Sequence, residues 1–128
     1  MSDKSIAEKL LIKRGRTVLF VNAPPGYRTR IGALPPNATI LKAVGAPADV
    51  IQVFVKSRAE LEAELPKLKR ALAPNGLLWV TYAKGTSKLK GDINRDSIAA
   101  YARTIGMEGV AMISIDDDWS ALRLKVLS

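Results

Sequence analysis

The sequence predicts an α/β domain in which a mostly parallel sheet of about six strands carries helices on both faces. Short apolar runs alternate with helical stretches along most of the chain, which favours parallel strands buried on both faces. The last two apolar runs, Val110–Ile115 and Ala121–Leu127, flank a tight acidic turn and predict a closing antiparallel hairpin. Because 128 residues suffice for one core, we expect a single domain over residues 1–128.

The N-terminal part predicts a short helix followed by the first strand. Ser5 and Glu8 have the spacing of a capping box, so a helix is expected to run to about Leu11. Thr17–Val21 is a continuous apolar run, and we expect it to be the first and central strand of the sheet. The segment Gly26–Leu34, which follows a proline-rich loop, predicts a helical turn or a short helix.

The middle of the chain predicts two strands and a longer helix. The two apolar runs are Thr39–Val44 and Asp49–Val55. A second capping-box pattern, Ser57 with Glu60, opens the helix. Its apolar stripe recurs at helical spacing, at Leu61, Leu65, Leu68 and Leu72. Pro66 lies inside the stripe and is expected to kink the helix.

The C-terminal half predicts a fourth strand, a basic loop and a last helix before the hairpin. Pro74-Asn75-Gly76 is typical of a stop and turn, so the strand is expected over Leu77–Ala83. Lys84–Gly91 is a loop of basic and small residues. Either Asp92 or Asn94 caps the following helix, and Gly106 ends it.

The chain has no cysteine and no histidine. Disulfides, thiolate metal sites, cysteine nucleophiles and histidine-based triads are therefore excluded. Histidine is the commonest general acid or base in enzymes, so its absence favours a non-catalytic protein.

The formal net charge is +8, and the first 30 residues hold seven Lys and Arg against two Asp and Glu. This excess predicts either a solubilising surface or contacts with nucleic acid or an acidic ligand. No apolar run reaches the roughly 20 residues that cross a bilayer. The N-terminus lacks the apolar core of a secretory signal, so we expect a cytoplasmic protein that does not bind membranes.

Several short motifs resemble known families. Leu72–Val80 (LAPNGLLWV) resembles the leucine, proline-glycine-glycine and apolar-strand passage of AdoMet-dependent methyltransferases, with Asn75 in place of one glycine. Over nearly its full length the chain resembles small uncharacterised bacterial proteins of domain-of-unknown-function family 3052. The residues carrying that resemblance are Asn22-Ala23-Pro24, Gly26-Tyr27, Phe54-Val55, Leu78-Trp79-Val80, Lys84-Gly85, Asp92–Asp96 and Asp117–Arg123. The resemblance implies a truncated, Rossmann-like and methyltransferase-like three-layer domain without an established activity.

The loop after the first strand disfavours AdoMet as a cofactor. An AdoMet site needs glycines there, so that the backbone can approach the cofactor, and usually an acid at the end of the second strand. Asn22–Gly26 has one glycine and two prolines, and prolines offer no N–H donor. The second strand ends at Lys42–Gly45, and no acid follows before Asp49. We therefore expect no cofactor.

Three other motifs have simple structural interpretations. Asn22–Tyr27 resembles the Asn-Pro-Pro-aromatic loop of amino-group methyltransferases, but Ala23 and Gly26 interrupt it and it follows the wrong strand. Lys84–Gly91 lacks the Lys-Ser/Thr of a phosphate loop after its second glycine. Asp116-Asp117-Asp118 predicts a hairpin turn rather than a metal site. Trp79 and Trp119 are predicted to pack in the core or the hairpin.

A ligand site is expected at the carboxyl ends of the parallel strands, where open α/β sheets bind ligands. The five candidate ligand-binding residues are Asn22, Tyr27, Lys56, Tyr82 and Lys84. The set is polar, aromatic and cationic and has no acid, so it suits a small anion or the carboxylate of a partner and provides no general base. The first hypothesis is therefore a non-catalytic methyltransferase-like binding domain. The alternatives are an AdoMet-dependent small-molecule methyltransferase with an atypical site, and a nucleic-acid-associated basic protein.

Overall fold

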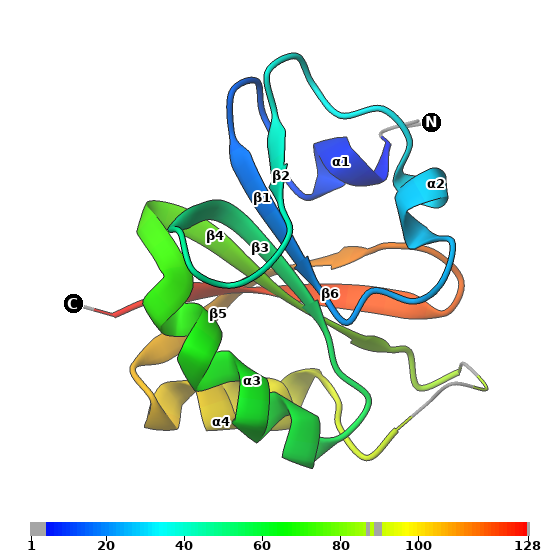
Figure 1. The fold of residues 1–128 in the computed structure, drawn as a ribbon. Coiled ribbons are helices and arrows are strands. Elements are labelled where there is room, and N and C mark those ends of the chain that lie inside the picture. The colour runs from blue at the N-terminus through cyan, green and yellow to red at the C-terminus, as the bar shows by residue number, and fades with distance from the viewer. Residues whose placement is uncertain (1–4, 87, 89–90, 128) are drawn as a thin grey trace.

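The computed structural model describes residues 5–86, 88 and 91–127 and has helices on both faces of one six-stranded sheet (Figure 1). The helices are α1 (Ile6–Lys9), α2 (Tyr27–Ile31), α3 (Arg58–Ala71) and α4 (Arg95–Thr104). The strands are β1 (Thr17–Val21), β2 (Thr39–Leu41), β3 (Ala48–Phe54), β4 (Leu72–Ala83), β5 (Met107–Ser114) and β6 (Trp119–Val126). None of the helices in these ranges is long and apolar enough to cross a membrane.

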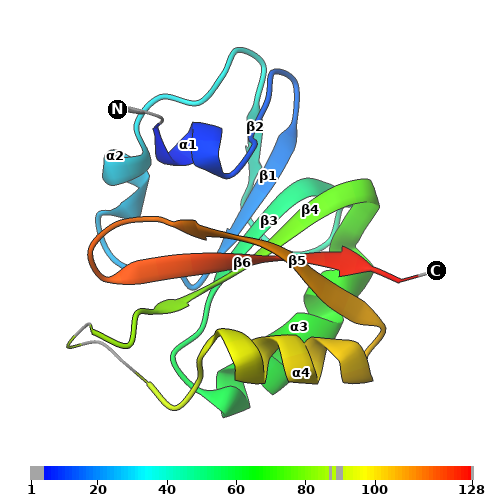
Figure 2. The ribbon, with the colours of Figure 1, turned by 180° about the vertical axis from the view of Figure 1, so that it is seen from behind.

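The strand order is β2-β1-β3-β4-β6-β5, in which β1 to β4 are parallel and β6 is antiparallel to both neighbours. The predicted parallel sheet with a closing hairpin is therefore confirmed, and Figure 2 shows the hairpin from behind. The expectation that Thr17–Val21 is central was wrong, because β1 is second from the edge and β3 and β4 are central. The chain extends the sheet outward to β2 and then adds all later strands on the other side of β1.

The sheet separates two hydrophobic clusters. The first lies against α3 and α4 and includes Leu61, Leu65 and Ile98. The second lies against α1 and α2 and includes Leu10 and Ile31. Side chains of β4 alternate between them: Leu78, Val80 and Tyr82 join the first cluster, and Trp79 and Ala83 join the second. Both tryptophans are buried, as predicted.

The helices begin at the residues that the sequence indicates. The backbone N–H of Ser5 donates to Glu8 Oε1 at 2.9 Å, and Ser5 Oγ accepts from Glu8 N–H at 3.2 Å, which completes the capping box of α1. Asn94, rather than Asp92, caps α4. Helix α3 continues through Pro66 and buries three of the four stripe leucines, Leu61, Leu65 and Leu68.

The start of β4 differs from the prediction. Pro74-Asn75-Gly76 lies within β4, in an irregular stretch between the pairs Ala48↔Leu72 and Val50↔Leu77, so it does not separate two elements. Asn75 has a left-handed φ of 63°. A Cβ at Gly76 would lie 2.8 Å from the carbonyl oxygen of Ala73, so a side chain there would force the backbone to shift. Conversely, β2 stops at Leu41, short of the expected Val44.

Strands β4 and β6 separate at the amino-terminal end of β4. Their ladder runs from Ala83↔Trp119 to Leu78↔Leu124. Beyond that pair, β4 stays with β3 as far as Leu72, whereas β6 stays with β5 as far as Val126. At the amino-terminal ends of the parallel strands the sheet therefore divides into two arms. Parallel sheets bind ligands at the opposite end, where the strands have their carboxyl ends.

Candidate functional site

The loop after β1 is shaped by two residues with left-handed backbone conformations. Asn22 has a φ of 59°, and Gly26, the N-cap of α2, has a φ of 82°. Asparagine and glycine adopt this region more readily than other residues do. The N–H of Tyr27 donates to the carbonyl oxygen of Pro24 at 3.1 Å and closes the turn. Asn22 is exposed at the carboxyl end of β1, whereas Tyr27 points into the core.

A pocket of about 350 Å³ lies at the carboxyl ends of β1 and β3. Its lining includes Asn22, the pair Pro24 and Pro25, Phe54 and Lys56. The two strands are neighbours, and the chain leaves them toward opposite sides of the sheet, β1 toward β2 and β3 toward β4. The pocket therefore occupies a topological switch point, where open α/β sheets bind ligands.

The start of α3 fixes the backbone of Lys56. Its N–H donates to Glu60 Oε1 at 2.8 Å, while Ser57 Oγ accepts from the N–H of Glu60 at 3.1 Å. From the other side, Gly91 packs so closely that a Cβ there would lie 1.7 Å from the carbonyl oxygen of Lys56. Within the described residues, the exposed ammonium of Lys56 has no hydrogen-bond or ion-pair partner.

Glu60 lines the same pocket, although the sequence set contained no acid. Its capping-box spacing from Ser57 was the available signal, because a capping glutamate turns back over the first turn of its helix. One of its carboxylate oxygens is engaged with the backbone of Lys56. Trp119, from β6, also lines the pocket, and the sequence alone did not place it there.

Tyr27 is part of a buried polar chain. Its hydroxyl donates to Gln52 Oε1 at 2.7 Å, and Gln52 Nε2 donates to Thr81 Oγ1 at 2.9 Å. Burial raises the pKa of Tyr27 well above its ordinary value, and the nearby carboxylate of Asp116 adds to the rise. The Tyr27 ring meets Phe54 edge-on at a centroid distance of 4.8 Å, so the side chain supports the floor of the pocket from within the core.

Tyr82 lies on the opposite face of the sheet. It belongs to the cluster under α3 and α4, whereas Tyr27 belongs to the cluster under α1 and α2. The Tyr82 hydroxyl donates to the sulfur of Met112 at 3.1 Å, and burial raises its pKa. The sheet therefore keeps the two tyrosines apart.

Lys84 is held by the hairpin. Its N–H donates to the carbonyl oxygen of Asp118 at 2.8 Å, and its Nζ donates to Ser114 Oγ at 2.7 Å. Of the five candidate residues, the structure thus brings Asn22 and Lys56 into one pocket. The other three lie in the core or against the hairpin.

The acidic turn of the hairpin is built around Asp116. Its Oδ1 accepts from the backbone N–H groups of Asp118 at 2.8 Å and Trp119 at 2.9 Å. Its other carboxylate oxygen forms an ion pair with Arg30, which follows the Asn22–Tyr27 loop on α2. The carboxylate therefore stabilises the turn and links the hairpin to α2.

No protein-family model and no curated protein matches this sequence, so membership of family 3052 stays a prediction. Solved structures do match. A SAM-dependent methyltransferase from Aquifex aeolicus has a TM-score of 0.65 at 15% identity, over 95% of this chain and 88% of that chain. A complex of DhpI with SAH gives 0.66 at 12% identity, over 95% and 83%.

A TehB-like SAM-dependent methyltransferase from Corynebacterium glutamicum gives a TM-score of 0.61 at 13% identity, over 98% of this chain and 89% of that chain. At these identities the likeness defines the fold and carries no function by itself. The chain therefore has the Rossmann-like α/β fold of the methyltransferases, as the sequence predicts.

Proposed function

We propose that this chain is a non-catalytic, methyltransferase-like binding domain that takes a small anion, or the carboxylate of a protein partner, in the pocket between Asn22 and Lys56. The observation that carries the proposal is Lys56, an exposed residue that lines the pocket at the switch point and whose ammonium has no partner among the described residues. Prolines, aromatic rings and the Glu60 carboxylate, which is engaged with the backbone of Lys56, also line the pocket. A cation in such a pocket attracts a compact anion.

The residues of the pocket do not fit AdoMet. Pro24 and Pro25 line it, and neither has an N–H to donate to the cofactor. Strand β2 ends at Leu41 and is followed by Lys42, where a ribose-binding acid would be needed. Glu60 is the acid that lines the pocket, and one of its oxygens already accepts the N–H of Lys56. These features support binding without methyl transfer.

Calorimetric titration with AdoMet and with its demethylated product separates this proposal from the methyltransferase alternative. We expect no saturable heat with either compound. Saturable binding of either one in the micromolar range would overturn the non-catalytic proposal and favour an atypical transferase.

Amide chemical-shift mapping with inorganic phosphate and with acetate tests the anion site directly. We expect saturable shifts at Asn22, Ala23 and Lys56, and binding weakened by about fivefold in Lys56→Gln, since one ion pair in a partly exposed pocket contributes roughly 1 kcal/mol. Lys67→Gln is the matched control, because Lys67 is an exposed lysine of α3 that pairs with Glu64 outside the pocket. Equal weakening in both variants, or shifts spread over the surface, would contradict an anion site here.

A further inference from the structure

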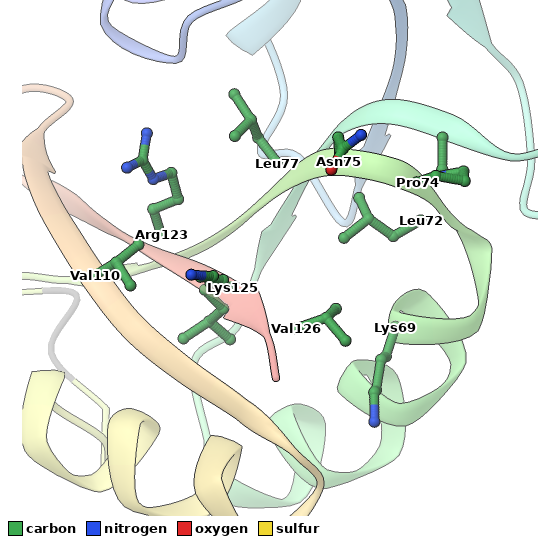
Figure 3. Close-up of a pocket in the computed structure, with 12 residues that line it drawn as sticks. Lys69, Leu72, Pro74, Asn75, Leu77, Val110, Arg123, Lys125 and Val126 are labelled. Carbon is green, nitrogen blue, oxygen red and sulfur yellow. The ribbon is translucent and has the colours of Figure 1, made fainter. Parts of the chain in front are cut away.

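A cavity larger than the Asn22–Lys56 pocket lies at the other end of the sheet, in the opening between the arms formed by β4 and β6. Its volume is about 570 Å³, within the range of small-molecule pockets. Figure 3 shows the two strands separating there, with Leu72 and Val126 between them and Lys69 below. We call it the amino-edge cleft, and it shares no residue with the Asn22–Lys56 pocket.

The irregular stretch of β4 keeps the cleft open. Because β4 follows β3 through Pro74-Asn75-Gly76, it turns away from β6 after the pair Leu78↔Leu124. Gly76 is confined by the carbonyl oxygens of Ala73 and Asp49, at 2.8 and 3.0 Å from where a Cβ would lie. This backbone packing fixes the β4 wall of the cleft to β3.

The charged side chains that line the cleft are all cationic. They are Lys69, Arg123 and Lys125. Lys69 uses one N–H to donate to the carbonyl oxygen of Ile105 at 2.6 Å, so two of its three donors remain. The Arg123 guanidinium lies 5.9 Å from the centre of the Trp79 ring, which orients it. Within the described residues, the exposed ammonium of Lys125 has no ion-pair partner.

Glu108, on β5, is an acid that faces this set. It lies directly across the ladder from Lys125. Its carboxylate, however, pairs with Arg103 at 3.2 Å and does not line the cleft. The cleft therefore keeps a net positive charge.

The rest of the lining is mainly apolar. Leu72, Leu77 and Leu124 contribute side chains that are wholly or partly buried, whereas Val110 and Val126 are 41% and 40% exposed. Exposed valines in a concave site lose water-accessible apolar surface when a hydrocarbon covers them, at about 25 cal/mol per Å². The described lining thus combines apolar walls with cations and includes no carboxylate. This combination favours an occupant that carries a negative charge and an apolar body.

We propose that the amino-edge cleft binds an organic anion with an apolar body, of the class of medium-chain or aromatic carboxylates. The carboxylate pairs with Lys125 and Arg123, and the hydrocarbon lies against Leu72, Leu77 and Val126. A second copy of this chain is a poorer occupant, because each copy carries a net charge of +8. The proposal does not depend on the function of the Asn22–Lys56 pocket.

Amide chemical-shift titrations of the full chain with dodecanoate, dodecyltrimethylammonium and acetate, below micellar concentrations, test this site. We expect saturable shifts with dodecanoate at Asn75–Leu77 and Arg123–Val126, with binding about tenfold tighter than for either of the other two probes. The cationic probe keeps the hydrocarbon chain and reverses the charge of the headgroup, whereas acetate keeps the carboxylate and lacks the long chain. Equal affinity for dodecanoate and dodecyltrimethylammonium, or shifts outside the cleft, would overturn the proposal.

Variants separate a local site from general attraction to a basic protein. Lys125→Glu removes a cation of the cleft, leaves the Arg123–Trp79 contact in place, and is expected to weaken dodecanoate binding about tenfold. Lys13→Gln with Lys42→Gln makes the same change in net charge at two exposed lysines outside the cleft and is expected to leave binding unchanged. Equal weakening by both would refute a specific site. Lys56→Gln is expected to keep full dodecanoate binding, so this proposal and the proposed function can fail separately.

Discussion

A group of buried polar side chains adjoins the second hydrophobic cluster. Tyr27, Gln52 and Thr81 form a continuous hydrogen-bonded chain, and the three side chains are almost completely buried. Such a buried chain is compatible with a stable fold only when each member has a hydrogen-bond partner, because an unpaired buried polar group costs about 1–3 kcal/mol. The chain crosses β3 and β4 beneath the Asn22–Lys56 pocket and so helps to hold the pocket floor.

Replacing Tyr27 with Phe is expected to destabilise the fold by about 1–3 kcal/mol near neutral pH, since Gln52 Oε1 loses its donor. The loss should shrink in alkali. Because the folded-state pKa of Tyr27 is raised by burial, only the unfolded chain releases this proton just above pH 10, and wild-type stability falls as pH rises from there. Urea unfolding at about pH 7 and about pH 11 measures both effects. A loss of equal size at both pH values would contradict the assignment.

Gly91 is expected to tolerate no side chain. A Cβ there would meet the carbonyl oxygen of Lys56 at 1.7 Å, so Gly91→Ala must move the loop or the start of α3, at a cost of roughly 1–3 kcal/mol. Gly85→Ala is the control from the same loop, since none of the described residues beyond its chain neighbours has an atom within 4 Å of its Cβ position, and should stay within about 0.5 kcal/mol of wild type. Urea unfolding compares the two, and the amide shift of Lys56 reports the displacement. Similar stabilities would contradict the contact.

At the residue scale, Asn22 and Lys56 could be predicted to lie at the same end of the sheet, because each follows an apolar strand. It could not distinguish a tyrosine at a strand end from a tyrosine in the core. Tyr27 turns inward because Gly26, in a left-handed conformation, starts α2 immediately before it. Glu60 was taken only as a capping residue, although capping places its carboxylate at the pocket.

At the scale of elements, the hairpin turn depends on Asp116 in two separable ways. Asp116→Asn keeps the Oδ1 acceptor of the turn and loses the ion pair with Arg30, whose side chain is 51% exposed, so we expect a cost of about 0–1 kcal/mol. Asp116→Ala also removes the acceptor and should cost about 1 kcal/mol more. Thermal unfolding of both variants measures the difference, with Asp117→Ala, an exposed neighbour, as the control. An equally large effect of Asn and Ala would indicate that the ion pair dominates.

Helices and strands could be predicted where residues adjacent in the sequence determine where they begin or end. Ser5, Ser57 and Asn94 start helices because their side chains accept the N–H three residues later, a signal that lies wholly in adjacent residues. Pro74-Asn75-Gly76 gave the same signal for a turn as for an irregular strand. Pairing with β3 on both sides of it kept the stretch within one strand, and that pairing is not local in sequence.

At the scale of the whole molecule, the sheet insulates one hydrophobic cluster from the other. Ile98→Val in the first cluster and Ile31→Val in the second are each expected to cost about 0.5–1.5 kcal/mol. Because the sheet separates the two sites, the double variant should cost the sum within about 0.5 kcal/mol. Urea unfolding of the three variants checks this. A coupling above about 1 kcal/mol would mean that strain passes through the sheet.

Fold class followed from the sequence because the alternation of apolar runs and capped helices is strong over the whole chain. Strand order did not follow, since Thr17–Val21 has the continuous apolar character of a central strand although only the short β2 covers its outer side. The amino-edge cleft also escaped prediction. It arises from two ladders ending at different residues, which no single segment encodes.

The early end of the β4–β6 ladder also bears on how this protein opens. Past the pair Leu78↔Leu124 the two arms hold no ladder in common, so thermal motion can part them without breaking the pairs that join β3 to β4 or β5 to β6. Amide protons at this edge should exchange with solvent through local openings, while those near Val80 should wait for global unfolding. A molecule that occupies the cleft would slow amide exchange in the two arms. Hydrogen exchange would therefore detect binding there even where the average structure does not change.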